Sequence, residues 1–203
     1  MISILDCNLG NIGTLVSKIS LLTDNFKVTQ KYQDLEKSEK IIFPGVGNSK
    51  HAIEFLNKNP ELKRIKFLIN EKKIPILGIC VGAQLMGSFC EEANQKGLSI
   101  LQFDTLRIPQ KKFYNLPHVG WNYLNFKKET FLFDKVDRKK RFYFTHSYYM
   151  KTNDLDIIEA TSYYGIDIPS VISKNNIFCI QFHPEKSHEQ GIQVLKNFIE
   201  YEF

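Results

Sequence analysis

Cysteine, histidine and glutamate occur in two short segments whose spacing suits nucleophilic catalysis. The first, GICVGAQLM (78–86), places Cys80 between Gly78 and Gly82, directly after an apolar run. This G-x-C-x-G spacing is the thiol counterpart of the G-x-S-x-G turn, in which a nucleophile stands between a strand and a helix. Unpaired N–H groups and the helix dipole favour a thiolate there. We predict that Cys80 is a nucleophile, although a buried cysteine at a tight turn explains this segment equally well on its own.

The second segment, IFCIQFHPEKS (177–187), supplies the histidine that a cysteine nucleophile needs to move protons. His183 ends an apolar run, and Pro184 favours an extended backbone at His183. Residues two apart in an extended chain face the same way, so Glu185 is expected to bond the His183 ring. This contact would fix the tautomer of the imidazole and favour its protonated form. The sequence therefore predicts a triad of Cys80, His183 and Glu185.

Main-chain N–H groups in two glycine-rich segments are suited to binding an oxyanion. The N–H of Val81 would point toward an oxyanion formed beside the Cys80 sulfur. The loop FPGVGNS (43–49) follows another apolar run, and its glycines free N–H groups to form an anion-binding nest. A plain tight turn explains that loop equally well when it is considered alone. Gln84 lies one helical turn beyond Cys80 on the same face, within reach of a bound ligand.

The elements that would position these segments alternate between strand and helix. Near-continuous apolar runs, typical of buried parallel strands, occur at 2–6, 40–45, 74–79 and 177–182. Helical patterns occur at 12–22, 49–58, 61–72 and 189–203. From 98–108 through 142–152 to 159–165, strand-like runs follow one another without a clear helix. We predict one α/β domain over residues 1–203, with an open, mostly parallel sheet flanked by helices and an antiparallel extension.

Composition argues against several functional classes. The 203 residues are 43% apolar and 24% charged, with a formal net charge of +5, which is ordinary for a globular protein. The basic run DRKKR (137–141) is typical of a solvated loop, and no motif for nucleic acid occurs. The four cysteines and five histidines show neither disulfide-framework nor metal-ligand spacing. With no signal-peptide pattern or membrane-spanning run, we expect a cytoplasmic protein without metal, cofactor or membrane contact.

Taken in order, PGVG, GICVGAQ and QFHPEKS resemble the class I, or triad, glutamine amidotransferases over nearly the whole chain. The segments LPHVGWN (116–122) and FYFTHSYY (142–149), with D-x-x-x-G-N (6–11), are similar to the glutaminase subunit of imidazole glycerol phosphate synthase. The resemblance implies a flavodoxin-like fold and the hydrolysis of L-glutamine.

The resemblance also implies a role for each matched position. Cys80 would attack the glutamine carboxamide, His183 would transfer protons, and Glu185 would orient His183. The main-chain N–H groups of Val46 and Val81 would hold the oxyanion. The residues expected to hold glutamine are Gly47, Gln84, Ser147 and Tyr148. Those expected to face the synthase partner and the route of ammonia are Asn11, Pro117, His118, Val119, Gly120, Trp121, Tyr143 and Lys186.

A separate partner is expected because ammonia becomes ammonium in neutral water and then lacks a nucleophilic lone pair. The resemblance implies a heterodimer with a (β/α)8-barrel synthase subunit that makes imidazole glycerol phosphate in histidine biosynthesis. Three alternatives stay open. They are a paralogous glutaminase subunit that supplies ammonia for amidation of a surface-sugar precursor, a stand-alone γ-glutamyl hydrolase, and a non-catalytic binding subunit. The intact Cys80, His183 and Glu185 argue against the last of these.

Overall fold

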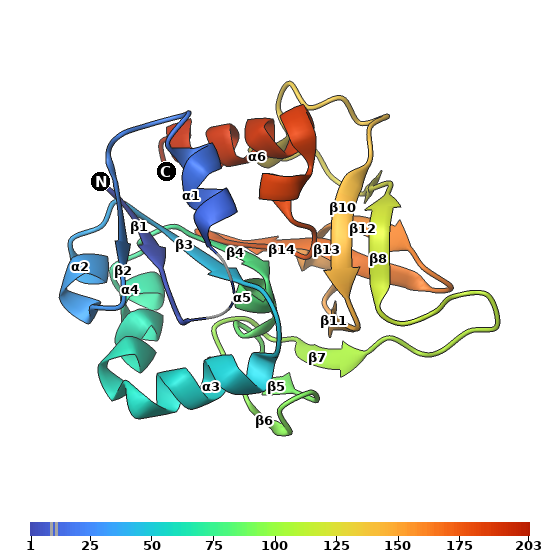
Figure 1. Ribbon diagram of the computed structural model, residues 1–203, viewed down its shortest axis with the longest axis horizontal. Coiled ribbons are helices and arrows are strands. Elements are labelled where there is room, and N and C mark those ends of the chain that lie inside the picture. The colour runs from blue at the N-terminus through green and yellow to red at the C-terminus, as the bar shows by residue number, and fades with distance from the viewer. Residues whose placement is uncertain (9, 11) are drawn as a thin grey trace.

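The computed structural model describes residues 1–8, 10 and 12–203 (Figure 1). Within those residues, the largest feature is an eight-stranded sheet with the order β2-β1-β3-β4-β14-β13-β12-β9. The parallel strands are β2 (Phe26–Thr29), β1 (Ile2–Leu5), β3 (Lys40–Gly45), β4 (Ile76–Cys80) and β14 (Ile177–Ile180). The antiparallel strands are β13 (Asp167–Lys174), β12 (Ile158–Tyr163) and β9 (Asn125–Phe126). The predicted parallel sheet with an antiparallel extension is therefore confirmed.

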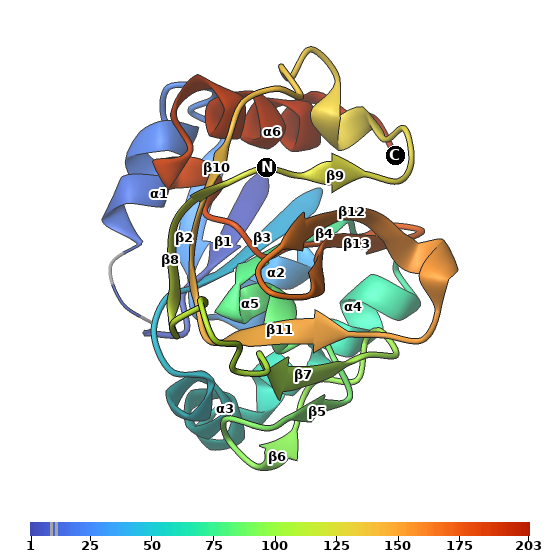
Figure 2. The ribbon, with the colours of Figure 1, turned by 90° about the vertical axis from the view of Figure 1, so that its right-hand side faces the viewer.

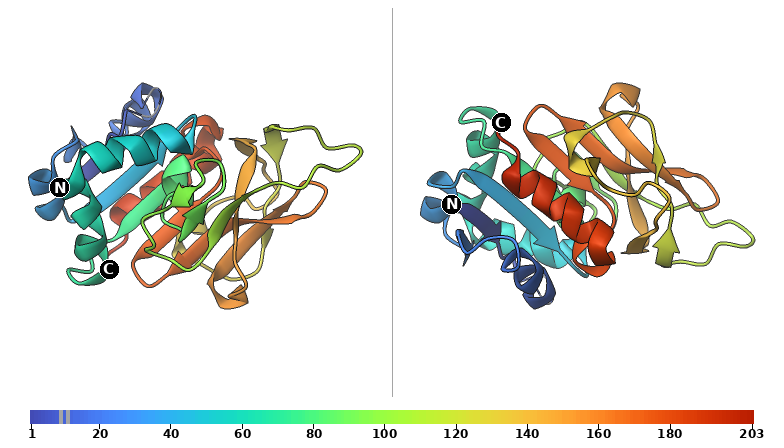
Figure 3. Two further views of the ribbon diagram at one scale, coloured as in Figure 1. Left: turned by 90° about the horizontal axis from the view of Figure 1, so that it is seen from below. Right: turned by 90° about the horizontal axis from the view of Figure 1, so that it is seen from above.

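Helices cover both faces of the parallel strands (Figures 1 and 3). On one face lie α1 (Gly13–Ile19) and α6 (His188–Glu200). On the other lie α2 (Tyr32–Glu36), α3 (Ser49–Lys58) and α4 (Ile65–Asn70). This double cover explains the continuous apolar runs, since Ile41, Ile42 and Phe43 of β3 are all fully buried. No helix among the residues that the structure describes is both long and apolar enough to cross a bilayer.

Two smaller sheets stand beside the carboxyl ends of the parallel strands (Figure 2). In one, β8 (His118–Asn122) pairs antiparallel with β10 (Phe142–His146). The other has the order β11 (Tyr148–Lys151), β7 (Asp104–Arg107), β5 (Phe89–Cys90) and β6 (Gln95–Lys96). The chain passes from β10 to β11 through the single residue Ser147, so one segment belongs to both sheets.

Some boundaries differ from those expected, for local physical reasons. The helix expected at 61–72 is a 3-10 turn, Pro60–Arg64, followed by α4. Proline suits a first helical turn because its missing N–H has no intrahelical partner there. Strand β2 was not predicted, because it is an edge strand in which Lys27 and Val28 are exposed and it lacks a continuous apolar run.

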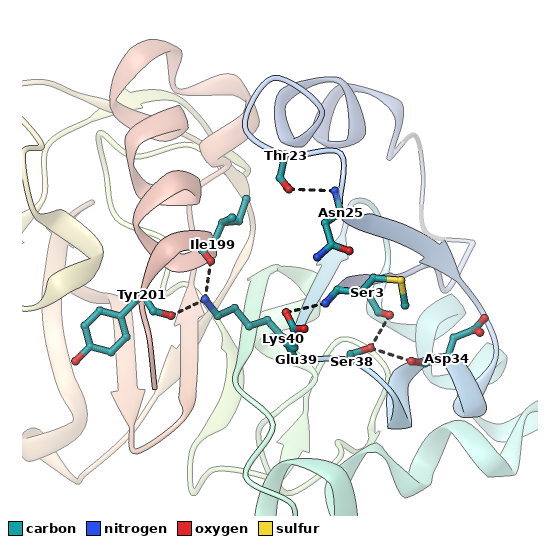
Figure 4. A network of polar contacts seen from close by, with 10 residues as sticks. Ser3, Thr23, Asn25, Asp34, Ser38, Glu39, Lys40, Ile199 and Tyr201 are labelled. Carbon is teal, nitrogen blue, oxygen red and sulfur yellow. Dashed lines mark hydrogen bonds and ion pairs between the residues drawn. The ribbon is translucent and has the colours of Figure 1, made fainter.

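Polar contacts at the amino ends of the parallel strands tie α6 to the sheet (Figure 4). Lys40 Nζ donates hydrogen bonds to the carbonyl oxygens of Ile199 and Tyr201, at the end of α6. Helix carbonyls at this position lack intrahelical partners, so the lysine satisfies them. Ser38 Oγ donates to Ser3 Oγ at 2.6 Å and joins β1 to the segment before β3. These contacts lie at the opposite end of the sheet from Cys80 and support the fold.

Candidate active site

The triad residues follow neighbouring parallel strands. Strands β4 and β14 pair with Ile79 opposite Ile180, so Cys80 ends one strand and His183 stands just past the end of the other. On the other side of β4, Gly45 of β3 pairs with Cys80. Carboxyl ends of parallel strands meet at one edge of a sheet, which is where α/β proteins bind ligands. The three predicted segments therefore converge at this edge.

Cys80 occupies a sharp turn between β4 and the short helix α5 (Val81–Gln84). Its φ of 52° and ψ of −112° are strained for a residue with a side chain, as found at functional turns. A Cβ on Gly82 would lie 1.9 Å from the Phe43 carbonyl oxygen, and one on Gly78 would lie 2.7 Å from the Ala83 Cα. Only glycine therefore fits on either side of Cys80. Because α5 has four residues, its free N–H groups matter here more than a helix dipole.

His183 is held by the predicted carboxylate. Its Nδ1 lies 2.8 Å from Glu185 Oε1, and both side chains are buried. The carboxylate accepts this bond, which leaves Nε2 for Cys80; among the described residues, Nε2 is buried without a hydrogen-bond partner. Burial opposes a charge on His183, but the Cys80 sulfur and then Glu185 outweigh it and raise the pKa of His183 above its usual value. A protonated His183 can give its proton to a leaving nitrogen.

Two further groups contact the sulfur. The Gln181 amide nitrogen lies 3.6 Å from Cys80 Sγ, and the Thr145 carbonyl oxygen lies 3.9 Å from it. Gln181 was not predicted from the sequence, although a signal was present. Gln181 precedes His183 by two residues, and residues so spaced in an extended chain face the same way.

A cavity of about 280 Å³ opens on Cys80. Its size is near the lower end of the range for small-molecule pockets. The cavity is lined by Val46, Gly47, Cys80, Val81, Gln84, Glu92, Pro117, Thr145, His146, Ser147 and Tyr148. These include both predicted oxyanion donors and the four residues expected to hold glutamine. Hollows of about 740 and 720 Å³ lie elsewhere on the surface, but no triad residue lines either of them.

Glu92 is a second residue that was not predicted from the sequence. Its Oε2 accepts hydrogen bonds from the Ser49 N–H at 2.8 Å and from the Ser49 hydroxyl at 2.5 Å. This fixes a carboxylate at the first turn of α3, and the side chain lines the cavity. A carboxylate in this place can accept hydrogen bonds from an ammonium group of a ligand. In the sequence, Glu92 stands in a polar stretch that resembles an ordinary loop.

A chain of hydrogen bonds supports the strand that borders the cavity. Gln84 Nε2 and His146 Nδ1 both lie 2.8 Å from the Tyr148 carbonyl oxygen, which can only accept. His146 Nε2 then faces His118 Nδ1 at 3.0 Å. Burial lowers the pKa of His146 to about 3 and that of His118 to about 4. Both rings are therefore neutral at pH 7, and His118 Nδ1 donates to His146 Nε2.

Most of the residues expected to face a partner lie on one exposed surface beside the cavity. Its residues come from β8 and the proline before it, from β10 and from the segment after His183. Trp121 packs edge-on against Tyr143 with ring centroids 5.8 Å apart, and Lys186 Nζ lies 5.6 Å from the Tyr143 ring. Val119 is 57% exposed and Trp121 is 37% exposed. We call Pro117, Val119, Gly120, Trp121, Tyr143 and Lys186 the β8–β10 surface.

His118 was also expected at this surface, but its side chain is buried. His118 is buried between Phe144 and Tyr164, with ring centroids 4.9 and 4.0 Å away. Successive side chains of a strand point to opposite faces, so Val119 and Trp121 point outward while His118 points inward. Asn11, which was expected at the same surface, lies outside the described residues.

Comparisons with known proteins show which family and which fold the chain resembles over its length. The family model described as glutamine amidotransferase class-I matches residues 3–201. The chain is 41% identical to the imidazole glycerol phosphate synthase subunit HisH of Caldanaerobacter subterraneus, over 98% of this chain and 97% of that protein. It is 40% identical to the subunit of the same name from Buchnera aphidicola, over 98% of each. A solved structure of a putative GMP synthase subunit from Thermoplasma acidophilum shares the fold, with a TM-score of 0.73 at 19% identity, over 98% of this chain and 91% of that one.

Proposed function

The chain belongs to the class-I glutamine amidotransferase family, and we propose that it is the glutaminase subunit of an imidazole glycerol phosphate synthase. It hydrolyses L-glutamine to glutamate and ammonia, and a synthase subunit uses the ammonia. The single observation that carries the proposal is that the buried His183–Glu185 pair follows the strand next to the one that Cys80 ends, and that Cys80 opens on a small cavity. The names of the full-length relatives support the choice of synthase.

The reaction begins when the Cys80 thiolate attacks the side-chain carboxamide carbon of glutamine. The residues Val46 and Val81 both line the cavity, and in this proposal their main-chain N–H groups hold the resulting oxyanion. Each such donor lowers a barrier of this kind by about 2.7–4 kcal/mol. His183 gives the proton on Nε2 to the departing nitrogen, which leaves as ammonia. A thioester between Cys80 and the glutamyl group remains. His183 then accepts a proton from water, which attacks the thioester and releases glutamate and Cys80.

The cavity also offers groups for the amino-acid end of glutamine. The Glu92 carboxylate is fixed by two hydrogen bonds from Ser49 and faces the cavity, so it is suited to the α-ammonium group. Gln84 already uses both N–H groups of its amide, on Tyr148 and Gln181, so its oxygen is the atom that it offers to a ligand. These contacts would hold the carboxamide end toward Cys80.

The β8–β10 surface is the proposed docking face for the synthase subunit, which we expect to be a (β/α)8 barrel. It lies beside the cavity, because Pro117 belongs to both, and it carries exposed Val119 and Trp121. Partly exposed aromatic rings with a neighbouring cation are common anchors in protein interfaces. A partner bound here would cover the cavity and receive ammonia before it meets bulk water.

Glutaminase assays with and without the synthase subunit test this proposal. We expect glutamate release to depend on Cys80 and to rise when the synthase partner and its acceptor nucleotide are present. A Cys80→Ala protein that hydrolyses glutamine at the native rate would exclude the mechanism. Full activity of the isolated chain, with no binding to the synthase subunit, would instead indicate a stand-alone hydrolase.

A further inference from the structure

The side chain of Gln181 is completely buried, and its polar atoms meet the catalytic centre. Its backbone N–H donates to the Ser170 carbonyl oxygen at 2.9 Å, which continues the pairing of the strands past the end of β14. The amide nitrogen then lies 3.6 Å from Cys80 Sγ, and the amide oxygen lies 3.0 Å from Gln84 Nε2. Burying an amide is unfavourable unless both ends find partners, and one partner here is the reacting sulfur.

The neighbours of Gln181 determine which end of its amide faces the sulfur. The Tyr148 carbonyl oxygen can only accept, so Gln84 must direct its NH₂ group toward it. The same NH₂ group reaches the Gln181 oxygen with its second hydrogen. A reversed Gln181 amide would set two NH₂ groups against each other. The Gln181 NH₂ group is therefore turned toward Cys80 Sγ by contacts that do not involve the sulfur.

We propose that Gln181 is a further catalytic residue, which donates a hydrogen bond to Cys80 Sγ and stabilises the sulfur as a thiolate. The proposal rests on the proposed function. An amide NH₂ group does not ionise at neutral pH, so it does not compete with His183 as acid or base. The bond acts before attack, when the sulfur is an anion. It acts again when the carbon–sulfur bond of the thioester breaks and its electron pair returns to the sulfur. A donor fixed in advance in a water-poor site is more effective than the same donor in water.

Alkylation of Cys80 tests the proposal without any need for glutamine turnover. Iodoacetamide is a small neutral electrophile that reacts with thiolates, and mass spectrometry of the peptide that contains Cys80 gives the rate. Gln181→Met keeps the length of the side chain and removes the donor, and Gln181→Glu replaces the donor with a carboxylate. We expect both variants to be alkylated at least about tenfold more slowly at pH 7, because a hydrogen bond to a charged group is lost.

Ser170→Ala is the matched control. It removes a buried hydroxyl of β13, whose Oγ lies 2.7 Å from Ser162 Oγ on the neighbouring strand β12. The contacts of the Cys80 sulfur stay intact. We expect alkylation of this variant at the native rate. Buried Cys179 reports folding in every sample, since it becomes labelled only when the core opens. Methionine and glutamate at position 181 disturb the core in different ways. The alkylation rate of Cys80 is therefore interpreted in the variant in which Cys179 stays protected.

The outcomes separate this proposal from the proposed function. Native alkylation rates in a folded Gln181 variant would overturn the role of Gln181, even if the protein is a glutaminase. Slow alkylation with native Cys179 protection supports the role, even if glutamine is not the substrate. If glutamine is the substrate, kcat should fall about tenfold in the Gln181 variants while the KM for glutamine changes less, because Gln181 contacts the sulfur and is not among the residues that line the cavity.

Discussion

Nδ1 of His183 donates a hydrogen bond to Oε1 of Glu185 across 2.8 Å, within a single segment of chain, and both side chains are buried. The segment is itself fixed, because the His183 N–H bonds the Tyr143 carbonyl and the Ser187 hydroxyl bonds the His183 carbonyl. The orientation of the imidazole therefore depends on local contacts. Its charge depends on Cys80 and Glu185 together, since both raise the pKa of His183.

Replacing Glu185 with glutamine should preserve the shape of the site and reduce catalysis. The neutral amide no longer favours a protonated His183, and it does not fix the tautomer with Nε2 toward Cys80. We expect kcat for glutamine hydrolysis to fall at least about a hundredfold. Glutamate release measures it, with the exposed Glu189→Gln as control. A Glu185→Gln enzyme within twofold of the native rate would show that the carboxylate is not part of the mechanism.

Replacing Glu92 with glutamine should weaken glutamine binding rather than slow the chemical steps. We expect KM to rise about tenfold with little change in kcat, because a charge-assisted contact with the α-ammonium group is lost. The neighbouring Glu91→Gln is the control, since Glu91 Oε2 accepts a bond from the Arg107 N–H and does not line the cavity. A glutamine analogue without the amino group provides the decisive comparison. If Glu92→Gln slows that analogue as much as it slows glutamine, Glu92 does not bind the ammonium group.

The sequence predicts those parts of the fold that depend on continuous apolar runs. Strand β3 was expected at 40–45 and lies there, because both of its faces are buried. Edge strand β2 was missed, because its exposed residues interrupt the pattern. In the site, Cys80 stands out through its two glycines, which close packing requires. Gln181 and Glu92 have no such signature, because their positions depend on contacts between residues far apart in the chain.

The orientation of a side chain in a short strand is a second property that the sequence did not settle. The motif PHVGWN marks the β8–β10 surface, but a motif does not say which of its residues point outward. Pairing of His118 with His146 and of Trp121 with Tyr143 sets the two faces of the β8–β10 sheet. The face with His118 then packs on Phe144 and Tyr164, so the imidazole is buried.

The buried histidine pair should make stability depend on pH. The folded protein keeps His146 neutral down to about pH 3. Burial lowers the pKa of His146 most, and the neighbouring His118 and His183 lower it further. The hydrogen bond to the Tyr148 carbonyl acts in the opposite direction. In the unfolded chain the ring takes up a proton near the ordinary histidine pKa of 6.5. The unfolded state thus binds more protons, and stability is lost as pH falls below 6.5. One such group contributes about 1.4 kcal/mol per pH unit in that window.

Urea unfolding between pH 6.5 and pH 5 measures this effect. His146→Gln can still donate to Tyr148 and accept from His118, so it should fold and lose less stability over this range than the native protein. His51→Gln, which replaces an exposed histidine in α3, should follow the native profile. Parallel profiles for His146→Gln and the native protein would mean that His146 is not the group responsible.

Trp121 should be an anchor for the synthase subunit. Its ring stacks on the His188 ring, with centroids 4.7 Å apart, and packs against the Tyr143 ring. These neighbours hold the Trp121 side chain in place, while 37% of the residue stays exposed. An ordered aromatic side chain loses little entropy on binding, and truncation of such anchors weakens complexes by about 2 kcal/mol or more. Trp121→Ala should therefore raise the Kd of the complex with the synthase partner about thirtyfold, as measured by calorimetry.

Phe67→Ala is the control. It removes a 47% exposed ring from α4, on the far side of the sheet, and the variant should bind the synthase partner normally. Equal affinities for the two variants would place the interface away from the β8–β10 surface.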